Sequence, residues 1–270
     1  MAFASFGICS IAWPADALPA ALDLSTKQGL TAIEIAPYSL FGGWEIPDLA
    51  IARLKSQLAA HGLTCAALQG ILYKASGAAL FVSPSSRAAM ARHLAAVAQL
   101  AGKLGAKACV FGAPQQRDPG SLAPEKAREI AVAFLREVGP VFASEGCAIA
   151  FEANAPRYAC RFVTTTAEAI DLVQEIATPG IGLQIDTGTL LSQREELSVL
   201  ARAVPVAVHA HVSEPDLVVV GSSGADHRPV AAALIVSGYR GSLSIEMKPV
   251  PAWADACTSA IAFVRSVYRA

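Results

Sequence analysis

Four side chains with metal-binding chemistry stand at the ends of short apolar runs. AIAFE ends at Glu152, GLQID at Asp186, VHAH at His211 and LSIE at Glu246. A charged group at the end of a buried strand is costly unless it is paired or binds a metal. Three clustered carboxylates repel one another without a cation, and oxygen donors with one imidazole suit Mn²⁺, Co²⁺ or Mg²⁺ better than a metal that prefers thiolates. The set predicts one divalent metal ion, with Mn²⁺ as the first candidate.

Taken singly, each of these residues has an ordinary alternative. A strand-end Asp such as Asp186 is often the N-cap of the next helix. A strand-end Glu often pairs with a lysine, and Lys248 stands close to Glu246 in the sequence. The metal prediction therefore depends on all four residues following consecutive apolar runs.

The elements that must position these residues repeat along the chain. An Ala- and Leu-rich stretch ends in glycine and an apolar run follows, as in KQGLTAIEI, GKLGAKACVF and ASEGCAIAFE. Glycine accepts the left-handed conformation that ends a helix, and an uninterrupted apolar run is typical of a parallel strand buried on both faces. Strands are expected near 6–10, 32–36, 64–69, 107–112, 148–152, 182–186, 206–211 and 242–246.

Eight strands, each followed by a helical stretch, predict an α/β fold: a single (β/α)8 TIM barrel. We expect one domain over residues 1–270, because the stretches rich in Pro and Gly are short enough to be loops. An open doubly wound sheet is the alternative, but such sheets usually have fewer strands and a Gly-rich phosphate loop after the first, where this chain reads SIAWP. Active sites of βα barrels lie at the C-terminal strand ends, so the four candidate ligands would meet at one rim.

Composition argues against several kinds of partner. The chain has 270 residues, is 54% hydrophobic and 16% charged, and carries a net charge of −1. This balance indicates a large core and gives no basic face for nucleic acid or an anionic membrane. The apolar stretches are shorter than the roughly 20 residues of a membrane-spanning helix, and the N-terminus lacks the pattern of a signal peptide. The six cysteines form no CxxC pair, so we expect a reduced cytoplasmic protein without a structural zinc.

Around the candidate ligands the chain resembles the xylose isomerase-like TIM barrels, the sugar phosphate isomerase/epimerase group that includes the D-tagatose and D-psicose 3-epimerases. The resemblance rests on FEAN, IDTG, HVSEP and SIEM, and it extends from ICSIAW to SIEMK. It implies that the four residues named above hold the metal. It also implies that Glu152 and Glu246 are the catalytic acid/base pair, whereas Asp186 and His211 are ligands only.

The resemblance implies a divalent-metal-dependent epimerase or isomerase of a ketose or sugar derivative. A metal on a ketone oxygen and its neighbouring hydroxyl acidifies the adjacent C–H and stabilises the enediolate. One glutamate would remove that proton and the other would return it, to the opposite face or to the neighbouring carbon.

Two departures from the family concern the substrate. The ketose epimerases have a histidine three residues after the strand-six aspartate, where this chain has Thr189. They also have a glutamate shortly after the strand-five ligand, where it has Arg157 and Tyr158. The substrate and its phosphorylation state therefore do not transfer.

Six further residues are candidates for substrate contact: Glu34, Gln69, Trp13, Arg157, Glu214 and His227. Glu34 ends the second run and can bond a substrate hydroxyl, support a metal ligand or form a buried pair with Lys or Arg. Gln69 can likewise contact a hydroxyl. Trp13 can wall a sugar pocket or simply pack within its loop.

The other candidates concern charge. Arg157 can bind an anion such as a phosphate. Arg117 in FGAPQQRD can bind a substrate phosphate or carboxylate or be an exposed arginine at a helix start, and we expect the exposed arginine. Glu214 can orient His211 or contact the substrate. His227, in the loop after the seventh strand, is expected to face the pocket.

A metal-dependent lyase or dehydratase acting on a keto-sugar or cyclitol is the main functional alternative, because an enediolate can expel a β-leaving group. An endonuclease of this fold is rejected, since those enzymes build a histidine-rich three-zinc cluster and this chain has five histidines, with Gln69 ending strand three. A non-catalytic sugar-binding protein is disfavoured because both glutamates are present. The expected partner is a small sugar-like molecule, and the resemblance implies pairing into a homodimer or homotetramer.

Overall fold

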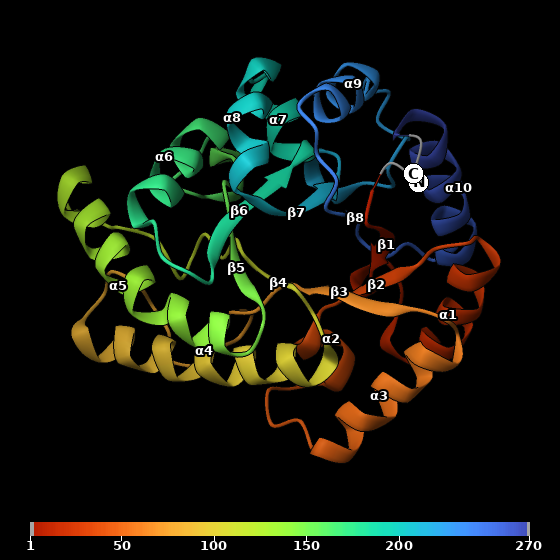
Figure 1. Cartoon of the computed structure of the whole chain (residues 1–270), viewed down its shortest axis with the longest axis horizontal. Coiled ribbons are helices and arrows are strands. Elements are labelled where there is room, and N and C mark those ends of the chain that lie inside the picture. The colour runs from red at the N-terminus through yellow and green to blue at the C-terminus, as the bar shows by residue number, and fades with distance from the viewer. Residues whose placement is uncertain (1–2, 269–270) are drawn as a thin grey trace.

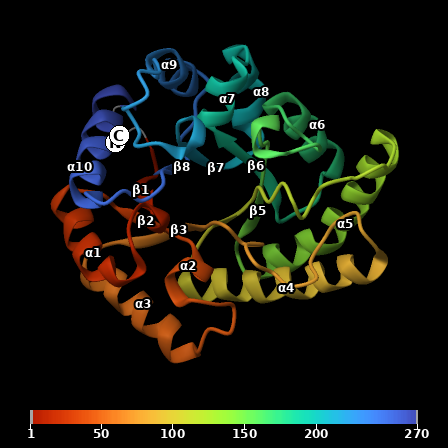
Figure 2. The ribbon, with the colours of Figure 1, turned by 180° about the vertical axis from the view of Figure 1, so that it is seen from behind.

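The computed structural model describes residues 3–268, and within them eight parallel strands close into a barrel in sequence order, β1 to β8. A ring of helices surrounds the barrel (Figures 1 and 2). The strands are β1 (Ser5–Cys9), β2 (Ala32–Ile35), β3 (Thr64–Leu68), β4 (Ala108–Phe111), β5 (Ala148–Glu152), β6 (Ile181–Asp186), β7 (Ala207–Val212) and β8 (Ser242–Ile245). Every strand boundary lies within one residue of its expected range, and the predicted (β/α)8 TIM barrel is confirmed.

Helices connect the strands on the outside of the barrel. They are α1 (Leu18–Lys27), α2 (Pro37–Phe41), α3 (Asp48–Ala60), α4 (Pro84–Leu104), α5 (Pro124–Ser144), α6 (Thr166–Ile176), α7 (Thr187–Gln193), α8 (Leu200–Ala203), α9 (Arg228–Val236) and α10 (Trp253–Tyr268). Helix α4 shows how sequence sets these limits. The Ser83 hydroxyl accepts the Ser86 N–H at 3.0 Å to begin it, and Gly105 ends it at a φ of +81°, as expected for a left-handed helix C-terminus.

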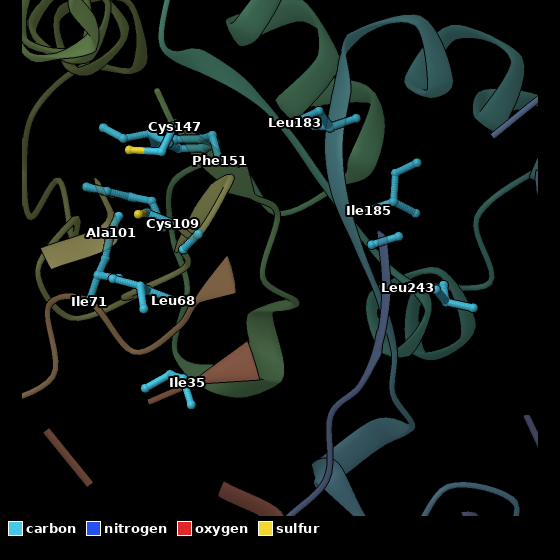
Figure 3. Packing of buried hydrophobic residues seen from close by; sticks show 14 of the residues in the cluster. Ile35, Leu68, Ile71, Ala101, Cys109, Cys147, Phe151, Leu183, Ile185 and Leu243 are labelled. Atoms are coloured by element: carbon cyan, nitrogen blue, oxygen red, sulfur yellow. The ribbon is translucent and has the colours of Figure 1, made fainter. Parts of the chain in front are cut away.

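Two apolar layers differ in the size of their side chains. The larger layer lies between strands and helices, and Figure 3 shows Ile35, Leu68, Phe151 and Leu183 among its members. The smaller cluster contains Ala67, Ala108, Val110 and Ala150, which alternate with the residues that face the helices. Such small side chains leave room for polar groups inside the barrel.

A polar interior is shown by contacts between strands that are not neighbours. Glu34 of β2 reaches His209 and His211 of β7, so these side chains must meet across the barrel. A register shift assists this arrangement: Leu183 pairs with Ala207 but Gln184 pairs with His209, which leaves one extra residue in β7. Bulges of this kind redirect side chains and are common beside active sites.

The cysteines and the helices bear on two of the expectations from composition. All six cysteines are buried and free of disulfides in the described part of the chain. Burial raises the pKa of Cys9 and of Cys109, which keeps these thiols protonated. No helix between residues 3 and 268 is both long and apolar enough to cross a membrane.

Candidate metal centre and substrate cavity

The four predicted ligands meet at one rim of the barrel. Glu152 and Asp186 are the last residues of β5 and β6, His211 lies one residue before the end of β7, and Glu246 follows β8. One donor atom from each lies within 4.8 Å of the others. His211 Nδ1 is 3.2 Å from Glu246 Oε2 and 3.6 Å from Glu152 Oε1. This is the spacing of donors that could share one ion.

Glu34 orients His211. Nε2 of this imidazole lies 2.9 and 3.0 Å from the two carboxylate oxygens of Glu34, and both side chains are fully buried. A proton on Nε2 would bond Glu34 and leave the Nδ1 lone pair for a metal, as is common for metal-binding histidines. Burial alone raises the pKa of Glu34, but His211 and His209 together hold it well below its usual range. Glu34 is therefore an anion that supports a candidate ligand.

Asp186 is both a helix cap and a candidate ligand. Its Oδ1 accepts the Thr189 N–H at 2.6 Å at the start of α7, and its Oδ2 accepts the Ser213 hydroxyl at 2.5 Å. Burial, with the charges of Glu152 and Glu246, raises the pKa of Asp186 to about 7. Because the charges of Glu152 and Glu246 oppose the ionisation of Asp186, a divalent cation bound among the three carboxylates would relieve this repulsion.

Gln69 holds the outer oxygen of Glu246. Its amide nitrogen donates to Glu246 Oε1 at 3.0 Å and lies 2.9 Å from Cys9 Sγ. The other oxygen, Oε2, then faces His211. Within residues 3–268 the ion-pair partner of Glu246 is thus His211, while Lys248 lies on the wall of the cavity beside it.

Glu152 is held by a pair of residues that the sequence did not single out together. Its Oε2 accepts the amide Nδ2 of Asn154 at 2.8 Å, and Asn154 Oδ1 accepts Nη2 of Arg117 at 2.8 Å. Gly112 makes this close arrangement possible, because a Cβ there would stand 2.5 Å from Glu152 Oε2. The expectation that Arg117 is exposed was wrong: the loop after β4 turns it inward, fully buried, with its guanidinium carbon 5.0 Å from the centre of the Phe151 ring.

A cavity of about 790 Å³ opens over the two glutamates, and a smaller one of about 200 Å³ adjoins it beside Asp186. Glu152, Glu246 and Tyr158 line both. The larger cavity also has on its wall Gln69, Tyr73, Lys74, Gln115, Gln116 and Lys248. A volume of this size is near the upper part of the range of about 300–1,000 Å³ for small-molecule sites.

Two of the residues expected at the substrate lie in other surroundings. Trp13 is buried against the ring of Trp253, at 6.4 Å between ring centres. Arg157 pairs on the surface with Asp216, Nη2 to Oδ2 at 2.6 Å. The neighbouring Tyr158 takes the place on the cavity wall.

Glu214 and His227 form a buried group beneath the rim. The carboxylate of Glu214 accepts the N–H groups of Gly221 and Ser223 at 2.8 and 3.0 Å. His227 lies between Glu214, at 3.2 Å, and the Tyr268 hydroxyl, at 2.7 Å. Glu214 also lines the smaller cavity, and its hydrogen bonds fix the loop after β7. His227, which was expected to face the pocket, is buried and lines neither cavity.

This buried histidine predicts a pH-dependent stability. Burial lowers the pKa of His227 below 6.5, although Glu214 opposes the effect. The unfolded chain therefore takes up this proton at a higher pH than the folded protein. The resulting stability is complete above about pH 6.5 and is lost as pH falls through the folded pKa. The melting temperature of wild type should fall more steeply between pH 7.5 and 5 than that of His227→Gln, and parallel curves would contradict this role.

A closed eight-stranded barrel with a carboxylate and histidine cluster at its strand ends defines the class of protein: a (β/α)8 barrel with a candidate metal centre. The family model for the xylose isomerase-like TIM barrel matches residues 22–267, and the chain belongs to this family. The resemblance seen in the sequence motifs is thereby confirmed.

Solved structures with the same fold include several sugar epimerases. D-psicose 3-epimerase from Clostridium cellulolyticum H10, solved with D-tagatose, has a TM-score of 0.83 at 19% identity, covering 98% of this chain and 99% of the other. An L-ribulose 3-epimerase gives 0.82 at 19% identity, with 99% and 95% covered. The 3-keto-D-glucoside 4-epimerase of E. coli gives 0.79 at 16% identity, with 97% and 99% covered. A search of curated protein sequences gives no significant match.

Proposed function

We propose that this protein is a divalent-metal-dependent epimerase or isomerase of a ketose or sugar derivative. The observation that carries the proposal is the placement of Glu152 and Glu246. They come from β5 and β8, they line the same cavity, and each has a carboxylate oxygen within 3.6 Å of His211 Nδ1. Two carboxylates that face one cavity beside a metal site suit the transfer of a proton between two positions of a bound sugar.

The metal proposal fits the residues that are present. Glu152, Asp186, His211 and Glu246 would hold one ion, with Mn²⁺ first and Co²⁺ or Mg²⁺ as alternatives, because the donors are three carboxylates and one imidazole. When bound, such an ion supplies Lewis acidity that makes the C–H next to a ketone more acidic. The protein's own part is to fix donors and bases in place and to enclose the substrate.

Glu152 and Glu246 are held in place by similar hydrogen bonds. Each has one oxygen held by a side-chain amide: Gln69 donates to Glu246 and Asn154 donates to Glu152. An ionised carboxylate on one side would accept the substrate proton, while a protonated one on the other side would donate. Because the two amide contacts are alike, they do not favour one direction of proton transfer over the other. We therefore infer that either glutamate serves as the base, according to the epimer bound.

Proton transfer of this kind can be detected through hydrogen exchange between the sugar and the solvent. In D₂O with Mn²⁺, wild-type protein should incorporate deuterium at a carbon next to the carbonyl of a converted sugar, detected by NMR and mass spectrometry across a panel of ketoses and keto-sugars. Conversion without any deuterium incorporation, or a dehydrated product in its place, would count against the epimerase proposal.

The cavity wall leads to a prediction about substrate preference. Thr189 lies beside Asp186, and its hydroxyl donates to the Ala153 carbonyl at 3.2 Å. The ketose epimerases have a histidine at this position, and a threonine cannot offer the imidazole of that histidine to a ketose. Lys74 and Lys248 line the larger cavity and have no carboxylate partner within 4.0 Å among residues 3–268. We therefore expect poor turnover of free D-fructose or D-psicose and better turnover of a derivative that carries an anionic group.

Kinetics with D-fructose and D-fructose 6-phosphate would test this preference. Lys248→Gln should lower kcat/KM about tenfold for an accepted phosphorylated sugar, because one charged contact is worth about 1.4 kcal/mol or more. The kcat/KM for a neutral sugar should stay unchanged. Lys103→Gln, which changes an exposed lysine paired with Asp48, is the matched control. Rapid turnover of D-fructose or D-psicose would show the inference from Thr189 to be wrong.

Some expectations from the sequence enter this proposal unchanged. We propose one domain, a small sugar-like partner, a cytoplasmic location and assembly into a homodimer or homotetramer. Size-exclusion chromatography with light scattering is the direct measurement of the last of these.

A further inference from the structure

We propose that Arg117 is a positioning residue for Glu152 and acts on it through Asn154. The inference rests on the proposed function, because it concerns a carboxylate proposed both to bind metal and to move a proton. Arg117 does not reach the cavity. It is separated from Glu152 by the amide of Asn154, so any effect on Glu152 passes through that amide.

Burying the charged side chain of Arg117 costs folding free energy, and a functional role would explain why the residue is kept there. The side chain is fully buried, and in the described part of the chain its Nε and Nη1 have no hydrogen-bond partner. Its one side-chain hydrogen bond there is from Nη2 to Asn154. Burial lowers the pKa of Arg117, and the charge of Glu152 acts in the opposite direction. A hydrophobic residue of similar length would fill this space without burying a charge.

The chemistry of the guanidinium sets the direction of the Asn154 amide. Arginine has only donors, so the Asn154 atom that faces Nη2 at 2.8 Å must be the oxygen. The amide nitrogen is then forced toward Glu152 Oε2, to which it donates at 2.8 Å. With the amide reversed, nitrogen would face guanidinium nitrogen and oxygen would face carboxylate oxygen, and both contacts would be repulsive. Arg117 thus selects the one orientation that supports an ionised Glu152.

Packing makes this orientation rigid. The guanidinium lies against Phe151, whose ring stacks on Phe111 with 5.5 Å between centres and 17° between planes. Phe151 immediately precedes Glu152 in β5. The same stack therefore fixes the arginine and the strand end that carries the glutamate, and Oε1 of Glu152 is left toward His211.

The consequence is specific to the metal centre. If Arg117 is replaced by Met, Asn154 Oδ1 loses the donor that anchors it, and the amide can swing away from Glu152 Oε2. Glu152 would then rotate away from the position that it shares with the other three donors. Residues that orient metal ligands typically contribute 10–100-fold to metal affinity or activity.

A thermodynamic cycle on Mn²⁺ affinity, measured by calorimetry on the full chain, tests the proposal. Arg117→Met and Asn154→Ala should each weaken Mn²⁺ binding about 10–100-fold. The double variant should be no weaker than the single ones, because both changes break the same connection. Arg117→Met should keep or raise its melting temperature while kcat falls more than KM changes. Arg161→Met, an exposed arginine paired with Asp118, is the control and should bind Mn²⁺ as wild type does.

The possible outcomes separate this inference from the proposed function. Wild-type affinity in Arg117→Met, or losses that multiply in the double variant, would overturn the role of Arg117 and leave the metal centre standing. Absence of Mn²⁺ binding by wild-type protein would overturn the proposed function and this inference with it. If Arg117→Met does not fold, Arg117→Gln takes its place in the cycle, because a glutamine amide can face Asn154 with either of its atoms and no longer fixes the orientation; wild-type Mn²⁺ affinity in this variant would overturn the role of Arg117.

Discussion

Glu246→Gln is expected to lower kcat by about 10²–10⁴-fold, the usual contribution of a general acid or base, while the fold stays intact. Glutamine has nearly the shape of glutamate and can still contact Gln69, but it cannot accept or return a proton. It is also a weaker metal ligand than a carboxylate. The effect should appear as loss of both deuterium exchange and product formation with any accepted sugar in saturating Mn²⁺.

Two comparisons isolate the acid/base role of Glu246. Glu137→Gln changes an exposed glutamate on α5 and should leave kcat unchanged. Circular dichroism and the melting temperature report whether Glu246→Gln is folded, and calorimetry reports how much metal it keeps. A folded, metal-loaded Glu246→Gln protein with wild-type turnover would remove the proposed role of this residue.

Mn²⁺ is expected to raise the melting temperature of wild-type protein strongly and that of His211→Ala hardly at all. Without a cation, Glu152 and Glu246 oppose the ionisation of Asp186, whose pKa is raised to about 7. A ligand at about 100 times its Kd stabilises a protein by about 2.7 kcal/mol. At about 2–4 °C per kcal/mol for a chain of this size class, the shift should be roughly 5–10 °C.

The same measurement has a pH control and a matched variant. Protons compete with the metal for Asp186 and His211, so the Mn²⁺-induced shift should be smaller at pH 6 than at pH 8. His61→Ala removes a histidine that pairs with Asp23 away from the strand ends and should keep the full shift. An undiminished shift in His211→Ala would mean that the ion binds elsewhere.

The barrel could be predicted because its physical signal is local. A parallel strand buried on both faces must be an uninterrupted apolar run, and a helix that precedes it commonly ends at a glycine such as Gly105. The candidate ligands were predicted from the same rule. The end of a strand places its last residue at the rim of the barrel, next to the last residues of the two neighbouring strands. That is why Glu152, Asp186, His211 and Glu246 converge in the structure.

The loops could not be predicted in the same way, because distant contacts determine them. Arg157 forms a hydrogen bond with Asp216, which is 59 residues away in the sequence, and His227 forms one with Tyr268, which is 41 residues away. Lys74 reaches the cavity wall from a left-handed backbone position with a φ of +54°. No apolar pattern indicates these pairings.

The burial of Arg117 was missed for a different reason. Arginine is almost never fully buried unless it is paired, so exposure was the reasonable expectation for FGAPQQRD. What reverses the expectation is the combination of Asn154 and the Phe151 ring, which meet Arg117 only in the folded protein. A retained cost of this kind is itself a sign of a functional constraint.

The metal content of the purified protein is the decisive measurement for the proposed metal centre. Wild type, Glu152→Ala and His211→Ala would be dialysed with Mn²⁺ and analysed by mass spectrometry of the elements. One bound equivalent per wild-type chain, lost in both variants, is the predicted result and follows from one shared cluster of donors. No bound metal in wild type, together with no thermal stabilisation by any added divalent ion, would rule out the proposed metal centre and leave the barrel without the proposed chemistry.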